Sequence, residues 1–167
     1  MESPLDRLIG EVESLYRAGD MRAAMAAADE LVERLPDEKR VWSRRAHLYR
    51  VAHEYSLAIS DLTAAIRISP HDSNEPYLYF FRGSCLLRVE RLEEALEDFT
   101  AGLDFCDLYK DDYYRETLFF FRAHTLIRLG RLSLALRDLE NVDESFSFWI
   151  DELQTKADLL RACKDSV

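Results

Sequence analysis

Three arginines stand inside apolar helical runs of this sequence, and each has an acidic residue 16 positions further along the chain. The pairs are Arg45 with Asp61, Arg82 with Asp98, and Arg122 with Asp138. A guanidinium group and a carboxylate can form two parallel hydrogen bonds. These residue types therefore serve either to capture an anionic ligand or to tie two elements of the fold together, and the elements that carry them decide between the two roles.

Those elements are repeats. The segments 42–70, 79–105 and 119–145 each open with an aromatic residue, have a small residue four positions later, and have a large apolar residue three positions after that. The nine residues are Trp42, Ala46 and Tyr49, then Tyr79, Gly83 and Leu86, then Phe119, Ala123 and Leu126. Intervals of three and four define one face of a helix. Each copy is predicted to form two amphipathic helices, with His53, Glu90 and Gly130 at the turn, where Gly130 accepts a positive φ angle.

A weaker copy precedes these three. It has its turn at Gly19, and Leu8 and Val12 stand where the aromatic and the small residue belong. The pattern resembles the tetratricopeptide repeat (TPR) family. The resemblance implies an all-α, right-handed α-solenoid of about four helix–turn–helix repeats in a single domain, residues 1–167. The repeats fall at about 4–36, 37–70, 76–107 and 116–145.

The turn of each repeat lies halfway between the arginine and its acid. In an antiparallel helical hairpin, residues equally far from the turn lie side by side, so each pair is expected to meet across its two helices. The weak first copy lacks both members, with Glu11 and Ala27 at the two positions. We therefore interpret the three pairs as structural ion pairs rather than ligand-binding residues.

The chain beyond residue 145 continues with apolar residues at helical spacing, and stacked repeats need a terminal element to cover the last exposed face. We predict a capping helix at about 146–163. Its stripe would consist of Phe146, Trp149, Ile150, Leu153, Ala157 and Leu160.

The first helix of each repeat carries another stripe of residues, which does not take part in the contact between the two helices of the hairpin. By resemblance to TPR proteins, these stripes line a concave groove that holds a peptide or a partner helix. The predicted groove residues are Tyr16, Arg17, Ser43, His47, Arg50, Phe80, Ser84, Leu87, Arg88, Phe120, His124, Ile127 and Arg128. Their mixture of aromatic, histidine and arginine side chains suits an interface. The alternative is that they pack on neighbouring helices or on the C-terminal helix.

The arginines of this stripe suggest a basic ladder for a carboxylate-bearing or acidic segment. The family's chaperone-tail binders use a lysine and asparagine clamp in this groove, and neither residue type occurs in these stripes. That particular specificity is not supported.

The sequence gives little support for catalysis, metal binding, nucleic-acid binding or membrane insertion. No catalytic motif is present, and neither the three cysteines nor the four histidines have metal-ligand spacing, so we expect no enzyme activity, no metal and no cofactor. The net charge of −10 argues against nucleic-acid binding. No apolar run approaches the roughly 18 residues of a membrane span, and the first residues do not resemble a signal peptide. We expect a cytoplasmic protein with reduced thiols and no membrane insertion.

The sequence thus favours a protein–protein interaction module that binds a protein or peptide partner in its groove. The alternative is a dedicated inhibitor or chaperone, of the immunity or secretion type, that masks a basic or secreted protein. The sequence leaves open a monomer or a homodimer, the latter formed through the segment 107–114 or the C-terminal helix.

Overall fold

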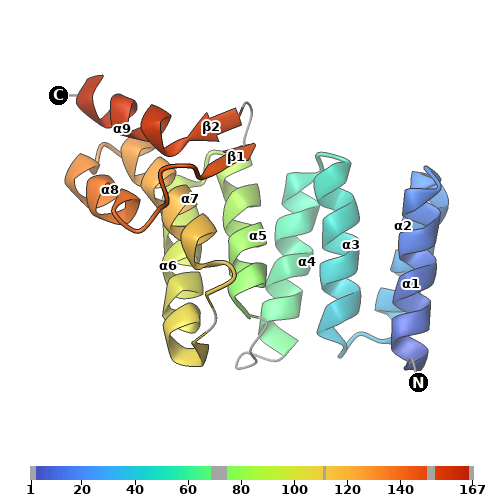
Figure 1. Cartoon of the computed structure of the whole chain (residues 1–167). Helices are drawn as coiled ribbons and strands as arrows, with labels where there is room; N and C mark the ends of the chain where they lie inside the picture. Colours follow the sequence, from blue (N-terminus) through green and yellow to red (C-terminus); the bar gives the residue numbers. More distant parts are fainter. Residues whose placement is uncertain (1–2, 69–74, 111, 150–152, 166–167) are drawn as a thin grey trace. The chain divides into compact units, whose positions relative to one another are not determined.

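The computed structural model describes residues 3–68, 75–110, 112–149 and 153–165. This part of the chain consists of antiparallel helical hairpins and one short β-hairpin (Figure 1). Its contacts divide it into two compact units, Met1–Asp72 and Ser73–Val167, here called unit 1 and unit 2. The expected all-α repeat architecture is confirmed, and the expectation of a single domain over 1–167 stays a prediction.

Unit 1 contains α1 (Pro4–Arg17), α2 (Met21–Arg34), α3 (Lys39–Val51) and α4 (Tyr55–Ile68). Each of these helices packs against the next one along the chain. Small and branched residues fill the space between the first three, with a core cluster of Val12, Ala24, Ala28, Leu31, Val32, Val41 and Leu48.

The first helix begins with a capping box. The backbone N–H of Asp6 donates to the hydroxyl of Ser3 at 3.1 Å, and the backbone N–H of Ser3 donates to the carboxylate of Asp6 at 3.2 Å. Pro4 occupies the first turn, where its missing N–H has no cost. The capping box and the proline together fix the residue at which α1 begins.

The turns within the hairpins share one backbone conformation. The angle φ is +83° at Gly19, +61° at His53, +62° at Glu90 and +72° at Gly130. A left-handed residue ends the first helix of each pair and lets the chain reverse. The predicted role of Gly130 is confirmed, and His53 and Glu90 adopt the same conformation although they carry side chains.

Unit 2 contains α5 (Glu75–Arg88), α6 (Leu92–Tyr109), α7 (Arg115–Arg128) and α8 (Leu132–Leu139). Two strands, β1 (Ser147–Trp149) and β2 (Leu153–Thr155), and a last helix, α9 (Lys156–Asp165), complete it. Helix α6 has 18 residues where α4 has 14, so part of the extra length between repeats extends a helix. The remainder of that insertion connects α6 to α7.

Small residues let the helices of unit 2 approach closely, as the position of Gly83 in its repeat suggested. A Cβ atom placed on Gly83 would lie 2.6 Å from the ring of Phe99, and one on Gly102 would lie 2.9 Å from the side chain of Leu118. Both large side chains are completely buried. The core of unit 2 therefore depends on the absence of side chains at these two glycines.

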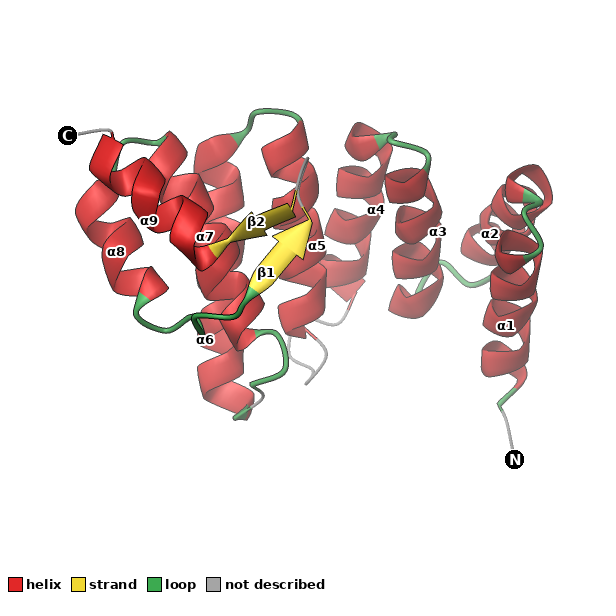
Figure 2. Ribbon diagram, turned by 45° about the horizontal axis from the view of Figure 1, so that its top comes forward, coloured by secondary structure: helices red, strands yellow, loops and turns green. Residues whose placement is uncertain are grey.

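The predicted capping helix over 146–163 is wrong in its first half. Strands β1 and β2 pair antiparallel, with Phe148 opposite Gln154, and the helix starts only at residue 156 (Figure 2). The polar–aromatic alternation of residues 145–148 has a period of two, which places Phe146 and Phe148 on the same side of an extended chain. Leu153 is exposed and does not belong to a buried helical stripe, and Ile150 lies outside the described residues.

Helix α9 begins at a second capping box. The hydroxyl of Thr155 accepts from the backbone N–H of Asp158 at 3.2 Å, and the carboxylate of Asp158 accepts from the backbone N–H of Thr155 at 3.0 Å. The helix then buries Leu159 and Cys163 and packs on both α7 and α8. A terminal helix that caps the last repeat is thus present, but it is shorter than expected and buries a different stripe.

Among the described residues, no helix is both long and apolar enough to cross a membrane.

Candidate functional site

The three predicted arginine–aspartate pairs all meet across their hairpins. Nε and Nη2 of each arginine donate to the two carboxylate oxygens of its aspartate at 2.6–2.8 Å. Each guanidinium carbon also lies over the aromatic ring that opens its repeat, at 5.3 Å from Trp42, 5.6 Å from Tyr79 and 5.5 Å from Phe119. The ion pair joins the two helices of the hairpin, and the ring contact lies within the first of them, so these guanidinium groups are engaged within the protein.

The pairs are mostly shielded from water. The side chains of Arg122 and Asp138 keep 21% and 7% of their exposure. Arg45 has a second partner, because its Nη1 donates to Asp29 at 2.9 Å. Its hydrogen bond with Asp61 raises the pKa of Arg45 above its ordinary value, against the opposite effect of burial.

The predicted groove stripes of unit 1 form one surface, which we call the α1/α3 face. It carries Tyr16 and Arg17 from α1 and Ser43, His47 and Arg50 from α3. Apart from exposed Arg17, these side chains are half-buried. The rings of Tyr16 and His47 meet edge to face, with their centres 5.6 Å apart. Both helices therefore contribute to the same surface.

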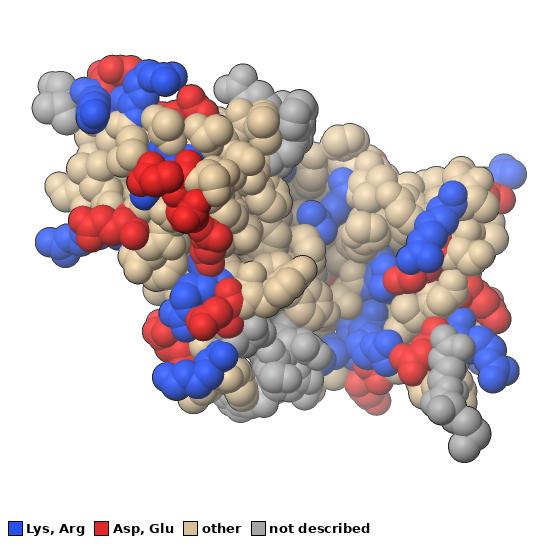
Figure 3. All heavy atoms as spheres, in the orientation of Figure 1, with Lys and Arg blue, Asp and Glu red and all other residues tan. Residues whose placement is uncertain are grey.

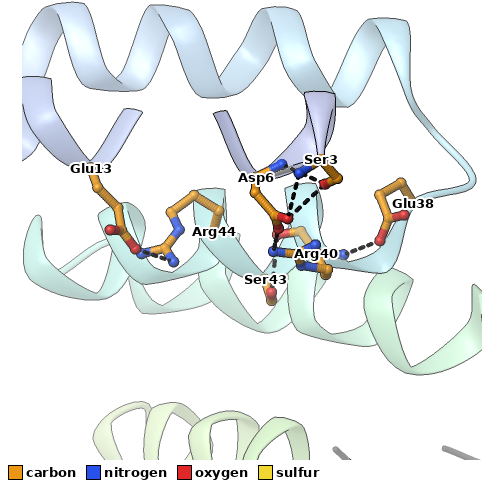
Figure 4. A network of polar contacts seen from close by, with 7 residues as sticks. All are labelled: Ser3, Asp6, Glu13, Glu38, Arg40, Ser43 and Arg44. Carbon is orange, nitrogen blue, oxygen red and sulfur yellow. Dashed lines mark hydrogen bonds and ion pairs between the residues drawn. The ribbon is translucent and has the colours of Figure 1, made fainter. Parts of the chain in front are cut away.

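Ion pairs join the two helices of this face (Figure 4). Nη2 of Arg44 lies 2.5 Å from the carboxylate of Glu13, and Nη2 of Arg40 lies 2.6 Å from that of Asp6. Arg17 donates to the same Glu13 at 3.2 Å. One carboxylate is thus shared by two guanidinium groups, which leaves a local excess of positive charge.

Helix α3, which supplies Arg44 and Arg50 to this face, is unusually basic. Residues 39–51 contain five basic side chains and no acidic one. Burial, Arg50 and Arg44 lower the pKa of His47, and Glu13 opposes them. Neutral His47 adds a hydrogen-bonding ring to a positively charged surface.

The corresponding surface of unit 2, which we call the α5/α7 face, differs from the α1/α3 face because another segment of the chain covers it. Of its predicted groove residues, Phe80, Leu87 and Phe120 are buried, with Phe120 completely enclosed. The C-terminal segment covers the two phenylalanines: the ring centre of Phe146 lies 5.1 Å from that of Phe120, and that of Phe148 lies 6.0 Å from that of Phe80. These side chains pack inside the protein, as the alternative interpretation of the stripes allowed.

The polar members of the α5/α7 face are dispersed. The hydroxyl of Ser84 donates to the carbonyl of Phe81 within its own helix, Arg88 is exposed, and Arg128 pairs with Glu90. A cavity of about 430 Å³ lies between α7 and the C-terminal elements. It is lined by His124, Ile127, Arg128, Leu153, Gln154, Asp158, Leu159, Arg161 and Ala162.

His124 is the most perturbed titratable group at this cavity. Burial, together with the neighbouring Arg128, lowers its pKa to about 4. Its Nδ1 atom and the Oε1 atom of Gln154 are buried without a hydrogen-bond partner among the described residues. Within the same residues, no three histidine, cysteine or acidic side chains are arranged to hold a metal ion.

Two features of these faces were missed in the sequence. The run of basic residues within 39–50 is the sequence feature that indicates the ion pairs between α1 and α3. The cover over the α5/α7 face had two signals, the alternation of residues 145–148 and the capping box formed by Thr155 and Asp158.

No family model matches the sequence. Several solved structures have the same fold. One is YrrB, described as a TPR protein with an unusual peptide-binding site; the TM-score is 0.68 at 18% identity, covering 80% of this chain and 64% of that one. Another is MamA, with a TM-score of 0.68 at 14% identity, covering 78% and 71% of the two chains.

A third is the TPR2B domain of yeast Sti1 in a complex with pHsp70. Its TM-score is 0.66 at 20% identity, covering 74% of this chain and 96% of that one. At these identities the similarity establishes the TPR fold, as the repeats in the sequence implied. The chain spans less than two thirds of the length of YrrB.

Proposed function

We propose that this chain is a protein-binding module and that its α1/α3 face holds an acidic segment of a partner protein. The observation that carries the proposal is the sharing of Glu13 by Arg17 and Arg44. A partner carboxylate would supply the second negative charge that this arrangement lacks. The solved structures of the same fold include a protein described with a peptide-binding site and domains in complexes with pHsp70 and pHSP90, which supports peptide recognition by such surfaces.

The chemistry of the face suits this role. Arginine recognises carboxylates through two parallel hydrogen bonds, and tyrosine supplies a rigid apolar contact with a polar tip. Tyr16 and His47 lie beside the charged groups and are half-buried, so part of each ring is available for contact. An acidic segment with an apolar side chain would satisfy both parts of the surface.

The test is affinity capture from native lysate with identification by mass spectrometry, using the wild-type chain and a charge-reversed Arg17→Glu/Arg50→Glu variant. We expect the variant to lose at least about tenfold in affinity for the captured partner, and added salt to weaken the wild-type complex. The control is Arg34→Glu, which reverses an exposed charge on α2 and should bind like the wild type. Equal capture by the folded double variant and the wild type would refute the proposal.

A second candidate is the inhibitor or chaperone that masks a basic partner. Unit 2 supports it: acidic side chains gather on one side of it, over the connection between α8 and β1 (Figure 3). Glu140, Asp143 and Glu144 on this connection are exposed. For such a function, reversing these three charges would abolish capture and reversing Arg17 and Arg50 would not.

A further inference from the structure

The α5/α7 face already holds an extended segment of the chain itself. Phe148 of β1 lies against two rings, with centre distances of 6.0 Å to Phe80 and 4.9 Å to Phe121, and Phe146 lies 5.1 Å from Phe120. Figures 1 and 2 show the β-hairpin across α5 and α7. We call residues 146–149 and 153–165 the C-terminal cover.

The cover fits this face unevenly. Its first strand is closely packed through aromatic rings, whereas the 430 Å³ cavity remains between α7 and the later part of the cover, β2 and α9. At the walls of the cavity, His124 Nδ1 and Gln154 Oε1 are buried without hydrogen-bond partners among the described residues. Protein cores are normally close-packed, and unpaired buried polar atoms are destabilising. The later part of the cover is therefore less closely packed against α7 than the first strand is against α5 and α7.

The polar anchors of the cover are near its base. The ammonium group of Lys156 donates to the carbonyl oxygen of Val142 at 2.8 Å and to the carboxylate of Glu144 at 2.6 Å. The backbone N–H of Asp143 donates to Glu116 at 2.6 Å. These contacts fix the connection from α8, while Phe146 and Phe148 are held on the face by ring contacts.

We infer that the α5/α7 face is a second protein-binding surface and that an extended partner segment, with aromatic residues at alternate positions, displaces Phe146 and Phe148 from it. The chemistry of this partner follows from the present occupant. Two aromatic side chains separated by one residue project to the same side of an extended chain and reach adjacent sites on α5 and α7. This inference is independent of the function proposed for the α1/α3 face.

The probe for this surface is a fluorescent synthetic peptide with the sequence of residues 143–165, added to the full-length protein. The chain's own cover competes at a high effective concentration, so the wild type should bind the peptide weakly. In Phe148→Ala the internal competitor is weakened, and binding should become about tenfold tighter. The matched control is Leu153→Ala, which truncates an exposed side chain of the same hairpin and should bind like the wild type.

A control peptide with both phenylalanines replaced by alanine should not bind either protein. The Arg17→Glu/Arg50→Glu variant should bind the peptide like the wild type, which separates this inference from the proposed function. If Phe148→Ala binds the peptide no more tightly than the wild type, the cover is not exchangeable and the inference fails. If the wild type forms a dimer that Phe148→Ala abolishes, the occupant is a second copy of the chain, and the inferred foreign partner is wrong.

Hydrogen exchange of the unmodified protein tests the inference without a variant. We expect amides of 146–149 and 153–165 to exchange through an opening that leaves α5, α6 and α7 protected. Equal protection of the cover and these three helices would show that the cover is a permanent part of the core and would overturn the inference.

Discussion

The two units present the same stripe of the same repeat in different ways. In the α1/α3 face, the stripe of α3 opens with Ser43 and continues with His47, and the surface remains half-exposed. In the α5/α7 face, the residues that open the stripes are Phe80 and Phe120, and both are buried under another segment. At this position the polar Ser43 of α3 belongs to a surface that water can solvate, whereas Phe80 and Phe120 belong to a surface that is covered by protein.

The largest expected difference is between one aromatic residue of each face, Phe120 in unit 2 and Tyr16 in unit 1. Phe120→Ala should lower the free energy of unfolding of unit 2 by about 4 kcal/mol, because it leaves a cavity under the cover. Tyr16→Ala in unit 1 should cost about 1 kcal/mol, because its ring is only half-buried. Hydrogen exchange resolved by helix measures both effects, and similar losses from the two variants would contradict the distinction between the faces.

The ion pairs within the hairpins should behave alike in both units. Arg122→Met should cost about 3 kcal/mol, because it leaves Asp138 buried without its partner. The double variant Arg122→Met/Asp138→Leu should recover most of that loss. Urea denaturation of the three proteins measures the effect.

The matched pair in unit 1 is Arg45 with Asp61, where we expect the same pattern. If Arg122→Met left stability unchanged but abolished binding to a partner, these arginines would be ligand-binding residues after all.

The histidines at equivalent positions provide a comparison by pH. The folded protein lowers the pKa of His124 from 6.5 to about 4, so the unfolded chain binds a proton more readily between these values. Stability from this group is complete above pH 6.5 and falls as the pH decreases, by about 2 kcal/mol between pH 7 and pH 5. His124→Gln should remove this part of the pH dependence.

The other charged groups at the cavity are Arg128, Asp158 and Arg161, and they remain in the variant. His47→Gln should have a smaller effect of the same sign, because the pKa of His47 is also lowered but the ring is less buried. Urea midpoints at several pH values measure both variants. An unchanged pH profile for His124→Gln would show that the ring is not neutral and buried.

The smallest effects come from two helical glycines. Gly83→Ala should destabilise unit 2 by about 1–2 kcal/mol, because the new methyl group would meet the ring of Phe99 at 2.6 Å. Gly10→Ala should stabilise α1 by about 0.5–1 kcal/mol, because nothing lies within 4 Å of the added atom and alanine favours helix. Thermal unfolding followed by circular dichroism gives both signs, and equal signs would contradict the difference in packing.

Much of the fold could be predicted because it is local and repeated. The spacing of 16 residues between Arg122 and Asp138 predicts their meeting once the turn at Gly130 is known. The helical hairpins follow from intervals of three and four, which occur in every copy. In these places the sequence pattern and the final contacts lie within the same hairpin.

The cover could not be predicted in the same way. Its apolar residues fit a helical stripe as well as an alternating strand, and the need of stacked repeats for a capping helix favours the helical interpretation. The burial of Phe80 and Phe120 then depends on Phe148 and Phe146, from the end of the chain. A contact between two segments far apart in the chain produces no regular residue spacing within either segment. The sequence pattern of each segment therefore does not predict it.

The burial of Cys163 on α9 has a consequence for the chemistry of the thiol. Its side chain is 3% exposed, and burial raises its pKa, so in the closed protein it is a poor nucleophile. Cys85 and Cys106 are buried in α5 and α6. The rate at which Cys163 is alkylated in the native protein would therefore measure how often the cover opens. The alkylation rates of the other two thiols serve as internal references.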